Sequence, residues 1–471
     1  RPINTTITPF LLNLVSICLD LRHRTRCKRK GVMVVFIGRE KELAMLNQAY
    51  LKGGNSIVVL YGREQIGKTT LVKKFVQDKT YVYYQARELS EKEQNRYFDK
   101  ALFSVKEKAE KERIVFVVDE FDLMQKGYKT FFADFLMKFD EFPKGQVMVL
   151  FVSSAIGWVE NDMVSDMGEL AKHMSLPIKL KEFTFVEMVD RFPESTTKDC
   201  ILIYGILGGV PGYLEHWNPK ESVKQNIVRL IVDKKGVLHT EAQRFLKTSL
   251  RELPFYSTIL SVLAENEPKL NYLFTRTGFS RAKISVYIKN LIQIDVAEKI
   301  FSYEPEKRDS VQKGLYGITD SFLQFWYQLI YPNFSDFSIQ SPDEFYEAHI
   351  KNGLDELAGK AYQKVCREFM ELMNQYHHLP AQFERFFSLY GKSGFIPLIA
   401  NTKEGKLLVG TCKWSNEPMT TNEFEELLQD IEQTGKEADY YYLFSKEGFT
   451  NELSVMAKSM DNIQCIDLEA M

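Results

Sequence analysis

Between residues 57 and 181, short apolar runs alternate with longer polar segments of helical periodicity. The apolar runs are nearly continuous and rich in β-branched and aromatic residues, as expected of strands that are buried on both faces of a parallel sheet. They lie at 56–62, 80–86, 114–120, 146–154 and 175–183. Helical stretches such as KTTLVKKFVQD and KTFFADFLMKF lie between them, so the pattern predicts an α/β sandwich.

From about residue 185 to 335 the pattern becomes helical. Within 256–320, one amphipathic helix is followed by a short second helix, and Gly278-Phe-Ser provides a turn and a cap. A third helix is predicted over 280–293, and the alternating residues after it indicate a hairpin. Three helices followed by a hairpin are typical of a winged helix-turn-helix.

Residues 340–471 return to a mixed α/β pattern. A helix is predicted over 345–376, and GFIPLIA and KLLVGTCKW are predicted to pair as strands around the turn NTKEG. YYYLFS, at 440–445, is predicted to be another buried strand.

The first 32 residues differ from the rest of the chain. A mostly apolar stretch at 9–19 precedes a strongly basic one. The stretch is too short to span a bilayer, and its order relative to the charges is the reverse of a signal peptide. Because MVVFIGREKEL resembles a natural start, we favour an upstream extension outside the fold. A basic anchor or DNA-binding arm and an ordinary first helix remain alternatives.

Composition changes this picture little. The length of 471 residues suggests about three domains. A net charge of −2 demands no nucleic-acid partner, so any basic surface must be local. The six cysteines are scattered without a CxxC pair, which indicates a reducing compartment and neither a disulfide framework nor a zinc site. Nothing marks a membrane span, and we expect a cytoplasmic protein.

Residues 62–69, GREQIGKT, match the phosphate-binding pattern G-x-x-x-x-G-K-[ST]. The match follows an apolar run and opens a helical one, which is the order the chemistry requires: the loop N–H groups and the helix dipole together hold phosphate. Gly62 and Gly67 permit the tight backbone. Lys68 is expected to reach the β- and γ-phosphates, and the Thr69 hydroxyl to ligate Mg²⁺.

A second element lies at the end of the apolar run that begins at Ile114, where Asp119 and Glu120 follow. Asp119 is predicted to hold Mg²⁺ directly or through water, and Glu120 to polarise the attacking water. Alone, an acid pair after a strand is usually a solvated strand end; the preceding loop favours the functional interpretation. Asp122 is a weaker addition. At the end of the next strand, Ser153 or Ser154 is predicted to touch the γ-phosphate or orient the water, with a capping role as the alternative.

Residues 33–471 resemble the archaeal-type ATPases, a STAND/AAA+ group. The resemblance rests on FIGREKELAMLNQAY (36–50), YGREQIGKTTLVKKF, LKEFTFVEMVDRFP (180–193) and YGILGGVPGYL (204–214). It implies that Arg39 lies near the nucleotide and that Gly209 and Pro211 lie against it. It also implies ATP as the nucleotide, and no NKxD guanine motif is present. YGITDSFLQFWYQLIYPN, at 316–333, is interpreted as an aromatic core stripe.

Together the pattern and the resemblance predict an α/β fold class: a P-loop NTPase sheet, a winged helix-turn-helix and a small nuclease-like α/β domain. The predicted segments are a basic extension at 1–32, a P-loop ATPase domain at 33–184, a helical lid or linker at 185–250, a winged helix domain at 251–335 and a degenerate PD-(D/E)xK nuclease-like domain at 340–471. The predicted catalytic residues are Lys68, Asp119, Glu120, Ser153 and Ser154. The predicted cofactor-binding residues are Arg39, Gly62, Arg63, Gly67, Lys68, Thr69, Thr70, Gly209 and Pro211, with Thr69 and Asp119 holding Mg²⁺.

Two departures from the family pattern matter. Before its fifth strand the family has Gly-Arg, whereas this chain offers Lys172 and His173, which puts an arginine at that point in doubt. In the C-terminal domain, Pro397, Thr411 and Gln363 stand where the family has metal-binding carboxylates, and only Lys413 remains. Phosphodiester cleavage needs carboxylates to hold Mg²⁺, so we expect this domain to be inactive as a nuclease.

These observations predict a Mg²⁺-dependent ATPase switch, slow or stimulated by a partner. The alternative is an ATP-gated DNA-binding regulator or a mobile-element or defence component, contacting duplex DNA through Arg281, Lys283 and Lys289. A nucleotide-binding scaffold without turnover remains open, and an active nuclease is disfavoured. A protein partner and oligomerisation are possible.

Overall fold

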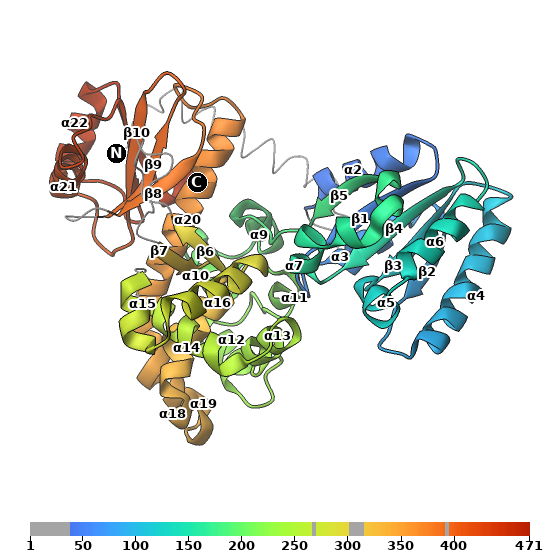
Figure 1. Cartoon of the computed structure of the whole chain (residues 1–471). Helices are drawn as coiled ribbons and strands as arrows, with labels where there is room; N and C mark the ends of the chain where they lie inside the picture. Colours follow the sequence, from blue (N-terminus) through green and yellow to red (C-terminus); the bar gives the residue numbers. More distant parts are fainter. Residues whose placement is uncertain (1–37, 266–269, 301–314, 391–394) are drawn as a thin grey trace.

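The computed structural model describes residues 38–265, 270–300, 315–390 and 395–471. The predicted extension at 1–32 and the turn of the predicted hairpin lie outside the described residues. Figure 1 shows a parallel sheet with its helices at one end of the molecule, a helical region in the middle, and a second sheet at the other end. No helix within the described ranges combines the length and the apolar character needed to cross a membrane.

The N-terminal part is a five-stranded parallel sheet with the order β2-β3-β4-β1-β5. Its strands are β1 (Ser56–Tyr61), β2 (Thr80–Gln85), β3 (Ile114–Asp119), β4 (Val147–Ser153) and β5 (Met174–Lys179). Each lies within a predicted apolar run or differs from it by one residue, and β3 and β4 are buried along their whole length. The predicted α/β sandwich is therefore confirmed.

Helices cover both faces of this sheet. On one face, α2 (Glu40–Leu51) and α3 (Lys68–Phe75) pack on residues such as Val58 and Leu60. On the other face, α4 (Glu91–Ala109) and α6 (Phe131–Asp140) pack on residues such as Ile57 and Val59. Successive β1 residues thus enter opposite cores, as strand geometry requires. The shorter helices of this part are α5 (Asp122–Gly127), α7 (Ile156–Asn161), α8 (Met163–Met167) and a 3₁₀-helix at Gly168–His173.

The strand order brings the predicted chemistry to one edge. Because β3, β4 and β1 are adjacent, Asp119 pairs with Val152 and Tyr61 pairs with Ser153. The loop after β1, the acids after β3 and the serines at the end of β4 therefore leave the sheet at the same level. Ligands bind outside the carboxyl ends of the strands in sheets of this kind.

A continuous helical region follows. Its elements are α9 (Phe185–Arg191), α10 (Thr197–Leu207), α11 (Pro211–Leu214), α12 (Val223–Ile227), α13 (Glu241–Ser249), α14 (Leu253–Ala264), α15 (Leu270–Thr277), α16 (Arg281–Gln293), α17 (Ser321–Phe325), α18 (Phe334–Ile339), α19 (Pro342–Phe345) and α20 (Leu354–Gln375), with π-helical turns at Val228–Val232, Trp326–Ile330 and Tyr346–Ile350 and 3₁₀ turns at Tyr331–Asn333 and Lys351–Gly353. The helix predicted over 345–376 is thus interrupted, because a π turn and a 3₁₀ turn precede α20.

Residues 253–318 have the predicted order of three helices and a two-stranded antiparallel sheet. The three helices are α14, α15 and α16, and the strands are β6 (Ala297–Ile300) and β7 (Leu315–Ile318). Gly278 has a φ of 68°, and the Ser280 side chain accepts a hydrogen bond from the Lys283 N–H at the start of α16. The turn and the cap are therefore where the sequence predicted them.

The C-terminal sheet has the order β12-β11-β10-β9-β8. Its strands are β8 (Phe386–Tyr390), β9 (Phe395–Asn401), β10 (Leu407–Lys413), β11 (Tyr440–Ser445) and β12 (Ile463–Asp467). The β9–β10 pair is antiparallel, as predicted, whereas β10, β11 and β12 run parallel. On one face this sheet packs on α20, and on the other it packs on α21 (Thr421–Glu432) and α22 (Asn451–Ser459), followed by a 3₁₀ turn at Leu468–Ala470.

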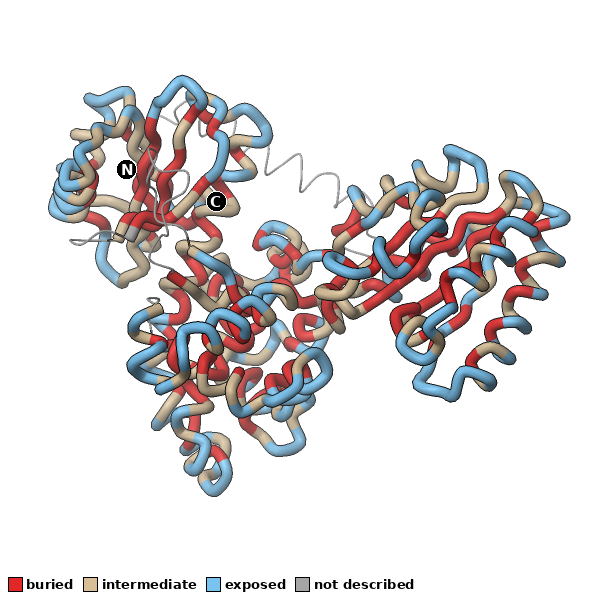
Figure 2. The backbone as a smooth tube through the Cα atoms, viewed as in Figure 1, coloured by how far each residue is buried: buried red, intermediate tan, exposed pale blue. Residues whose placement is uncertain are grey.

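One hydrophobic core joins the helical region to the C-terminal sheet. It runs from Phe183 through α10 and α14 to α20, and it includes Tyr442 and Phe444 of β11. Trp326 is 1 % exposed within it, so the segment at 316–333 contributes core aromatics, as predicted. Figure 2 shows this buried path running through the middle of the molecule. The segments predicted at 185–250, 251–335 and 340–471 therefore share packing.

Candidate nucleotide-binding site

The loop between β1 and α3 depends on its glycines. A Cβ on Gly62 would lie 2.5 Å from the Leu180 carbonyl oxygen, a distance that real side chains do not adopt. Gly67, the N-cap of α3, has a φ of 92°, which disfavours any other residue. The loop thus turns sharply into a helix N-terminus, where backbone N–H groups and the helix dipole favour an anion.

Lys68 is folded back onto this loop. Its Nζ donates to the carbonyl oxygens of Gly62 (2.8 Å) and Arg63 (2.9 Å) and to Ser154 Oγ (2.9 Å). The side chain is buried, and this desolvation lowers its pKa, while Glu120 and Asp119 oppose the shift. An ammonium held by neutral acceptors gains from meeting phosphate oxygens, so the site fits an anionic ligand.

Asp119, at the end of β3, is held at both carboxylate oxygens. Its Oδ1 accepts the Glu120 backbone N–H at 3.0 Å, and its Oδ2 accepts the Tyr83 hydroxyl of β2. Glu120 has a φ of 51°, a left-handed conformation that is uncommon for a residue with a side chain. Strained backbone of this kind concentrates at functional sites.

Ser154 joins the lysine to the glutamate. Its Oγ donates to Glu120 Oε1 at 2.8 Å and accepts from Lys68 Nζ. Burial raises the pKa of Glu120, and the Ser154 hydrogen bond and the Lys68 charge oppose that shift. Ser153 instead donates to Asp122 Oδ1 at 2.7 Å. Of the two predicted serines, the structure places only Ser154 between Lys68 and Glu120.

Thr69 and Thr70 lie in the first turn of α3 and are exposed. Thr69 follows Lys68 directly at the start of α3, and Asp119 ends β3 at the same edge of the sheet. Hydroxyl and carboxylate oxygens are ligands that Mg²⁺ accepts. The residue types present therefore fit a Mg²⁺–nucleotide, and the roles of Thr69 and Asp119 as Mg²⁺ ligands stay a prediction.

Arg39 lies beneath the loop. It is 5 % exposed, and its Nη2 donates to the carbonyl oxygens of Lys181 (2.6 Å) and Ile66 (3.4 Å). Its guanidinium also stacks 4.7 Å from the centre of the Phe183 ring. Arg39 thus holds the loop backbone to the segment after β5.

The Arg63 side chain contacts residues of the helical region and the segment before it. Its Nη1 contacts Asp320 Oδ2 and Glu182 Oε1, the latter at 3.2 Å, and its Nη2 donates to the Tyr213 hydroxyl at 2.9 Å. The guanidinium lies 4.2 Å from the centre of the Phe245 ring. The sequence assigned Arg63 to the nucleotide, whereas the structure pairs it with the helical region. No sequence signal marks a partner 257 residues away.

Gly209 and Pro211 take different positions. Gly209 packs on backbone: its carbonyl accepts the Phe183 N–H at 2.8 Å, and a Cβ there would lie 1.9 Å from the Phe183 oxygen. Pro211 begins α11, and its Cγ lies 3.8 Å from where a Cβ on Gly67 would be. The next residue, Gly212, donates its N–H to the Gln65 oxygen at 3.0 Å. The end of this motif from Pro211 to Tyr213 therefore touches the phosphate loop, whereas Gly209 packs on Phe183.

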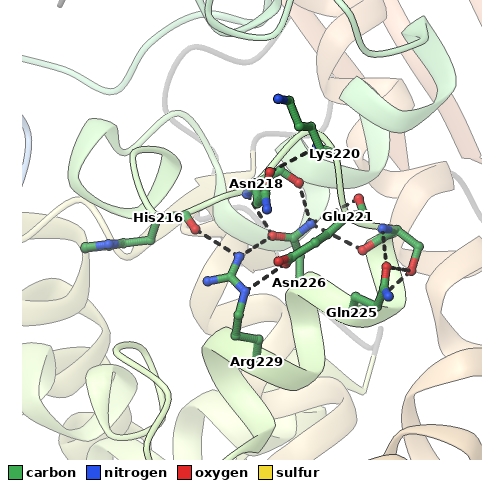
Figure 3. A network of polar contacts seen from close by, with 8 residues as sticks. His216, Asn218, Lys220, Glu221, Gln225, Asn226 and Arg229 are labelled. Carbon is green, nitrogen blue, oxygen red and sulfur yellow. Dashed lines mark hydrogen bonds and ion pairs between the residues drawn. The ribbon is translucent and has the colours of Figure 1, made fainter.

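The other end of α11 is held by a polar network, shown in Figure 3. Asn226 is fully buried, and its Nδ2 donates to the Asn218 and Ser222 oxygens at 2.9 and 3.2 Å. Arg229 donates to Asn226 Oδ1 at 2.7 Å and to Glu221 at 2.8 Å. This network fixes the turn between α11 and α12.

Two further loop side chains reach the helical region. Glu64 accepts from Arg244 at 2.7 Å, and Gln65 donates to Glu241 at 3.2 Å. The sequence did not single out the residues that contact the loop in this way, which are Tyr213, Glu241, Arg244 and Asp320. It also did not single out Tyr83, which contacts Asp119. Lys172 and His173, by contrast, pair with Glu169 and with the Phe139 ring.

The fold and this site define the class: a P-loop NTPase. The sequence matches the family described as an ATPase domain predominantly from Archaea over residues 36–95, and a family of archaeal and bacterial proteins of unknown function over residues 326–427. These matches confirm the resemblance to the archaeal-type ATPases that the sequence motifs indicated.

Several relatives and solved structures are similar to this chain. An uncharacterized protein of Methanocaldococcus jannaschii is 26% identical over 416 residues, covering 85% of this chain and 92% of its own. An uncharacterized ATP-binding protein of the same organism is 38% identical over 47 residues, which is 10% of this chain and 80% of its own. A Walker-type ATPase of Pyrococcus abyssi has a TM-score of 0.47 at 13% identity, covering 64% of this chain and 99% of that one. The ORC2 protein of Aeropyrum pernix, in ADPNP–ADP complexes, has a TM-score of 0.41 at 14% identity, covering 68% and 97%.

Proposed function

We propose that this protein is a Mg²⁺-dependent ATPase switch with slow or partner-stimulated turnover. The observation that carries the proposal is the chain of contacts from Lys68 through Ser154 to Glu120, beside Asp119 and at the carboxyl edge of β1, β3 and β4. A lysine, a hydroxyl, a strained glutamate and a metal-binding carboxylate at one point form the set that phosphoryl transfer to water needs.

Each residue has a role in this proposal. Lys68 exchanges the loop carbonyls for phosphate oxygens, and Glu120 orients and deprotonates the attacking water. Mg²⁺, held by Thr69 and Asp119, neutralises phosphate charge when it is bound. Arg39 and Arg63 are themselves buried and already paired, so we expect an arginine for the transition state to come from a partner molecule.

The test is ATP turnover by the full chain with and without Mg²⁺. Lys68→Ala should abolish binding, because it removes the phosphate contact. Glu120→Gln should keep binding but lose turnover. Lys73→Ala, an exposed lysine on the same helix, is the matched control and should resemble the parent protein. ATP binding that survives Lys68→Ala would overturn the proposal, whereas binding without turnover would favour the scaffold alternative.

An ATP-gated DNA-binding regulator is the second candidate, favoured by exposed basic residues on α16. Arg281 and Lys289 are exposed. Lys283 instead lies over three aromatic rings, with its Nζ 3.3 Å from the centre of the Phe255 ring, so it is the least available of the three. Duplex-DNA binding by the Glu120→Gln protein at several salt concentrations tests this candidate.

For the C-terminal sheet we propose a nuclease-like domain without nuclease activity. Pro397 lies on β9, where its carbonyl accepts the Ser388 hydroxyl at 2.9 Å, and Thr411 and Lys413 lie on β10. Lys413 Nζ pairs with Glu423 and donates to the Pro418 oxygen at 3.0 Å. Metal-dependent nicking of plasmid DNA that disappears in Lys413→Ala would contradict this proposal.

A further inference from the structure

We infer that Asp320 is a positioning residue of the nucleotide site, acting through Arg63 on the loop that holds Lys68. The inference rests on the proposed function and names how the helical region acts on that site. Asp320 lies between β7 and α17, far from the loop in sequence.

The Asp320 carboxylate is fixed at both oxygens. Oδ1 accepts the Leu323 N–H at 2.8 Å and so caps α17, while Oδ2 pairs with Arg63. Asp320 is 1 % exposed and Arg63 6 % exposed. One side chain thus joins the start of a core helix to the phosphate loop with no freedom to turn away.

The contact continues from Arg63 to the lysine. The Arg63 side chain pairs with Asp320, and the Arg63 backbone oxygen accepts Lys68 Nζ at 2.9 Å. Any movement of Lys68 toward phosphate therefore alters the residue that Asp320 holds. Conversely, a shift of α17 alters the acceptor on which Lys68 rests.

The neighbouring loop residues repeat the pattern. Glu64 pairs with Arg244, and Gln65 is held by Glu241 and by the Gly212 N–H. Three successive loop residues are thereby attached to α11, α13 and the start of α17. Arg63 is the only one of the three that is buried, so its pair is the one that water cannot replace.

A buried ion pair adds little to the stability of a protein, but it fixes the relative positions of its two side chains. Its desolvation cost offsets much of its attraction, whereas removing one partner leaves a charge that the interior does not solvate. Burial works against the Arg63 charge, but the carboxylates of Asp320 and Glu182 and the Tyr213 oxygen outweigh it and raise the Arg63 pKa. The pair therefore resists separation, and nucleotide binding and the position of α17 should be coupled in both directions.

The variant that isolates this role is Asp320→Asn. Asparagine caps a helix as well as aspartate does, so α17 keeps its cap while the Arg63 pair loses its charge. Asp343→Asn is the control, because Asp343 forms an exposed pair with Lys224 at 3.0 Å. We expect ATP affinity to fall about tenfold or more in Asp320→Asn, within the usual range of coupling between sites, and to stay unchanged in Asp343→Asn.

Hydrogen exchange of the full chain with and without Mg²⁺-ATP separates positioning from mere stability. In the parent protein, protection should rise at residues 62–69 and also at 319–325; in Asp320→Asn, the second change should disappear. Protection of 62–69 with unchanged exchange at 319–325 in the parent protein would overturn the inference and leave the proposed function standing. Unaltered ATP affinity in Asp320→Asn would overturn it equally. Exchange that ATP changes nowhere would overturn the proposed function, and the inference with it.

Discussion

The Ser154 hydroxyl opposes the rise in the pKa of the proposed general base, Glu120. Burial raises the pKa of Glu120, and the Ser154 hydrogen bond lowers it. The glutamate works only as a carboxylate, so turnover falls as the pH drops through its pKa. Ser154→Ala removes the lowering contact, and the acidic limb of the pH–rate profile should therefore move to higher pH. Ser153→Ala is the matched control, because Ser153 donates to Asp122, and its limb should stay in place.

Tyr83 supports the proposed metal ligand from the edge strand. Its hydroxyl donates to Asp119 Oδ2, and partners of this kind orient a ligand. In Tyr83→Phe, the Mg²⁺ concentration for half-maximal turnover should rise by about tenfold, the lower end of the usual cost of losing such a partner. Tyr81→Phe removes a hydroxyl from the same strand and should change nothing. Equal Mg²⁺ dependence in the two variants would show that the Tyr83 contact is incidental.

The motifs predicted site residues that lie close together in the sequence, but they did not predict contacts between distant residues. Lys68 follows from the loop pattern, and Asp119 and Glu120 follow from the strand that precedes them. Sequence left Ser153 and Ser154 as alternatives, because successive residues at a strand end point different ways and the pattern does not fix which one faces the loop. The sequence assigned Arg63 to the nucleotide because Arg63 lies within the loop pattern. Its partner, Asp320, lies far away in the sequence.

At the scale of elements, the strands buried on both faces were predictable because their apolar runs are continuous. Strands β8 and β12 were missed: FFSLY is short, and IQCID alternates with polar residues. The long helix at the start of the C-terminal part was predicted in extent, but periodicity alone does not report the π turn at Tyr346–Ile350. Such departures from regular α-helix depend on packing against other helices.

At Gly209 the backbone lies directly against the backbone of Phe183, which connects the first sheet to the helical region. A Cβ there would lie 1.9 Å from the Phe183 oxygen, so Gly209→Ala must displace backbone and should lower the free energy of unfolding by about 1–3 kcal/mol. Gly359, inside α20, is the contrasting position: its Cβ would meet Trp414 at an ordinary 3.7 Å. Gly359→Ala should raise stability by up to about 1 kcal/mol. Denaturant unfolding of both variants measures their free energies of unfolding. A Gly209→Ala protein as stable as the parent would contradict the close contact with Phe183.

For the whole molecule, the exposed basic residues of α16 predict how DNA affinity depends on salt concentration. If Arg281 and Lys289 contact phosphates, replacing either with alanine should reduce the slope of log affinity against log salt by about 0.9. Lys283→Ala should leave the slope unchanged, since its ammonium is held by aromatic rings. Equal effects of all three substitutions would contradict the assignment, and salt-independent binding would remove DNA as a partner of this face.

The pairing of Arg63 with Asp320 has a consequence for heredity. The two regions with family matches, 36–95 and 326–427, look like modules that recombination would exchange freely. Yet a chimaera joined anywhere between residues 63 and 320 would take the arginine from one parent and the carboxylate from the other. Offspring in which only one of the two is present would carry an unpaired buried charge, and selection would remove them. We therefore expect the residues at positions 63 and 320 to be kept or replaced together among related proteins.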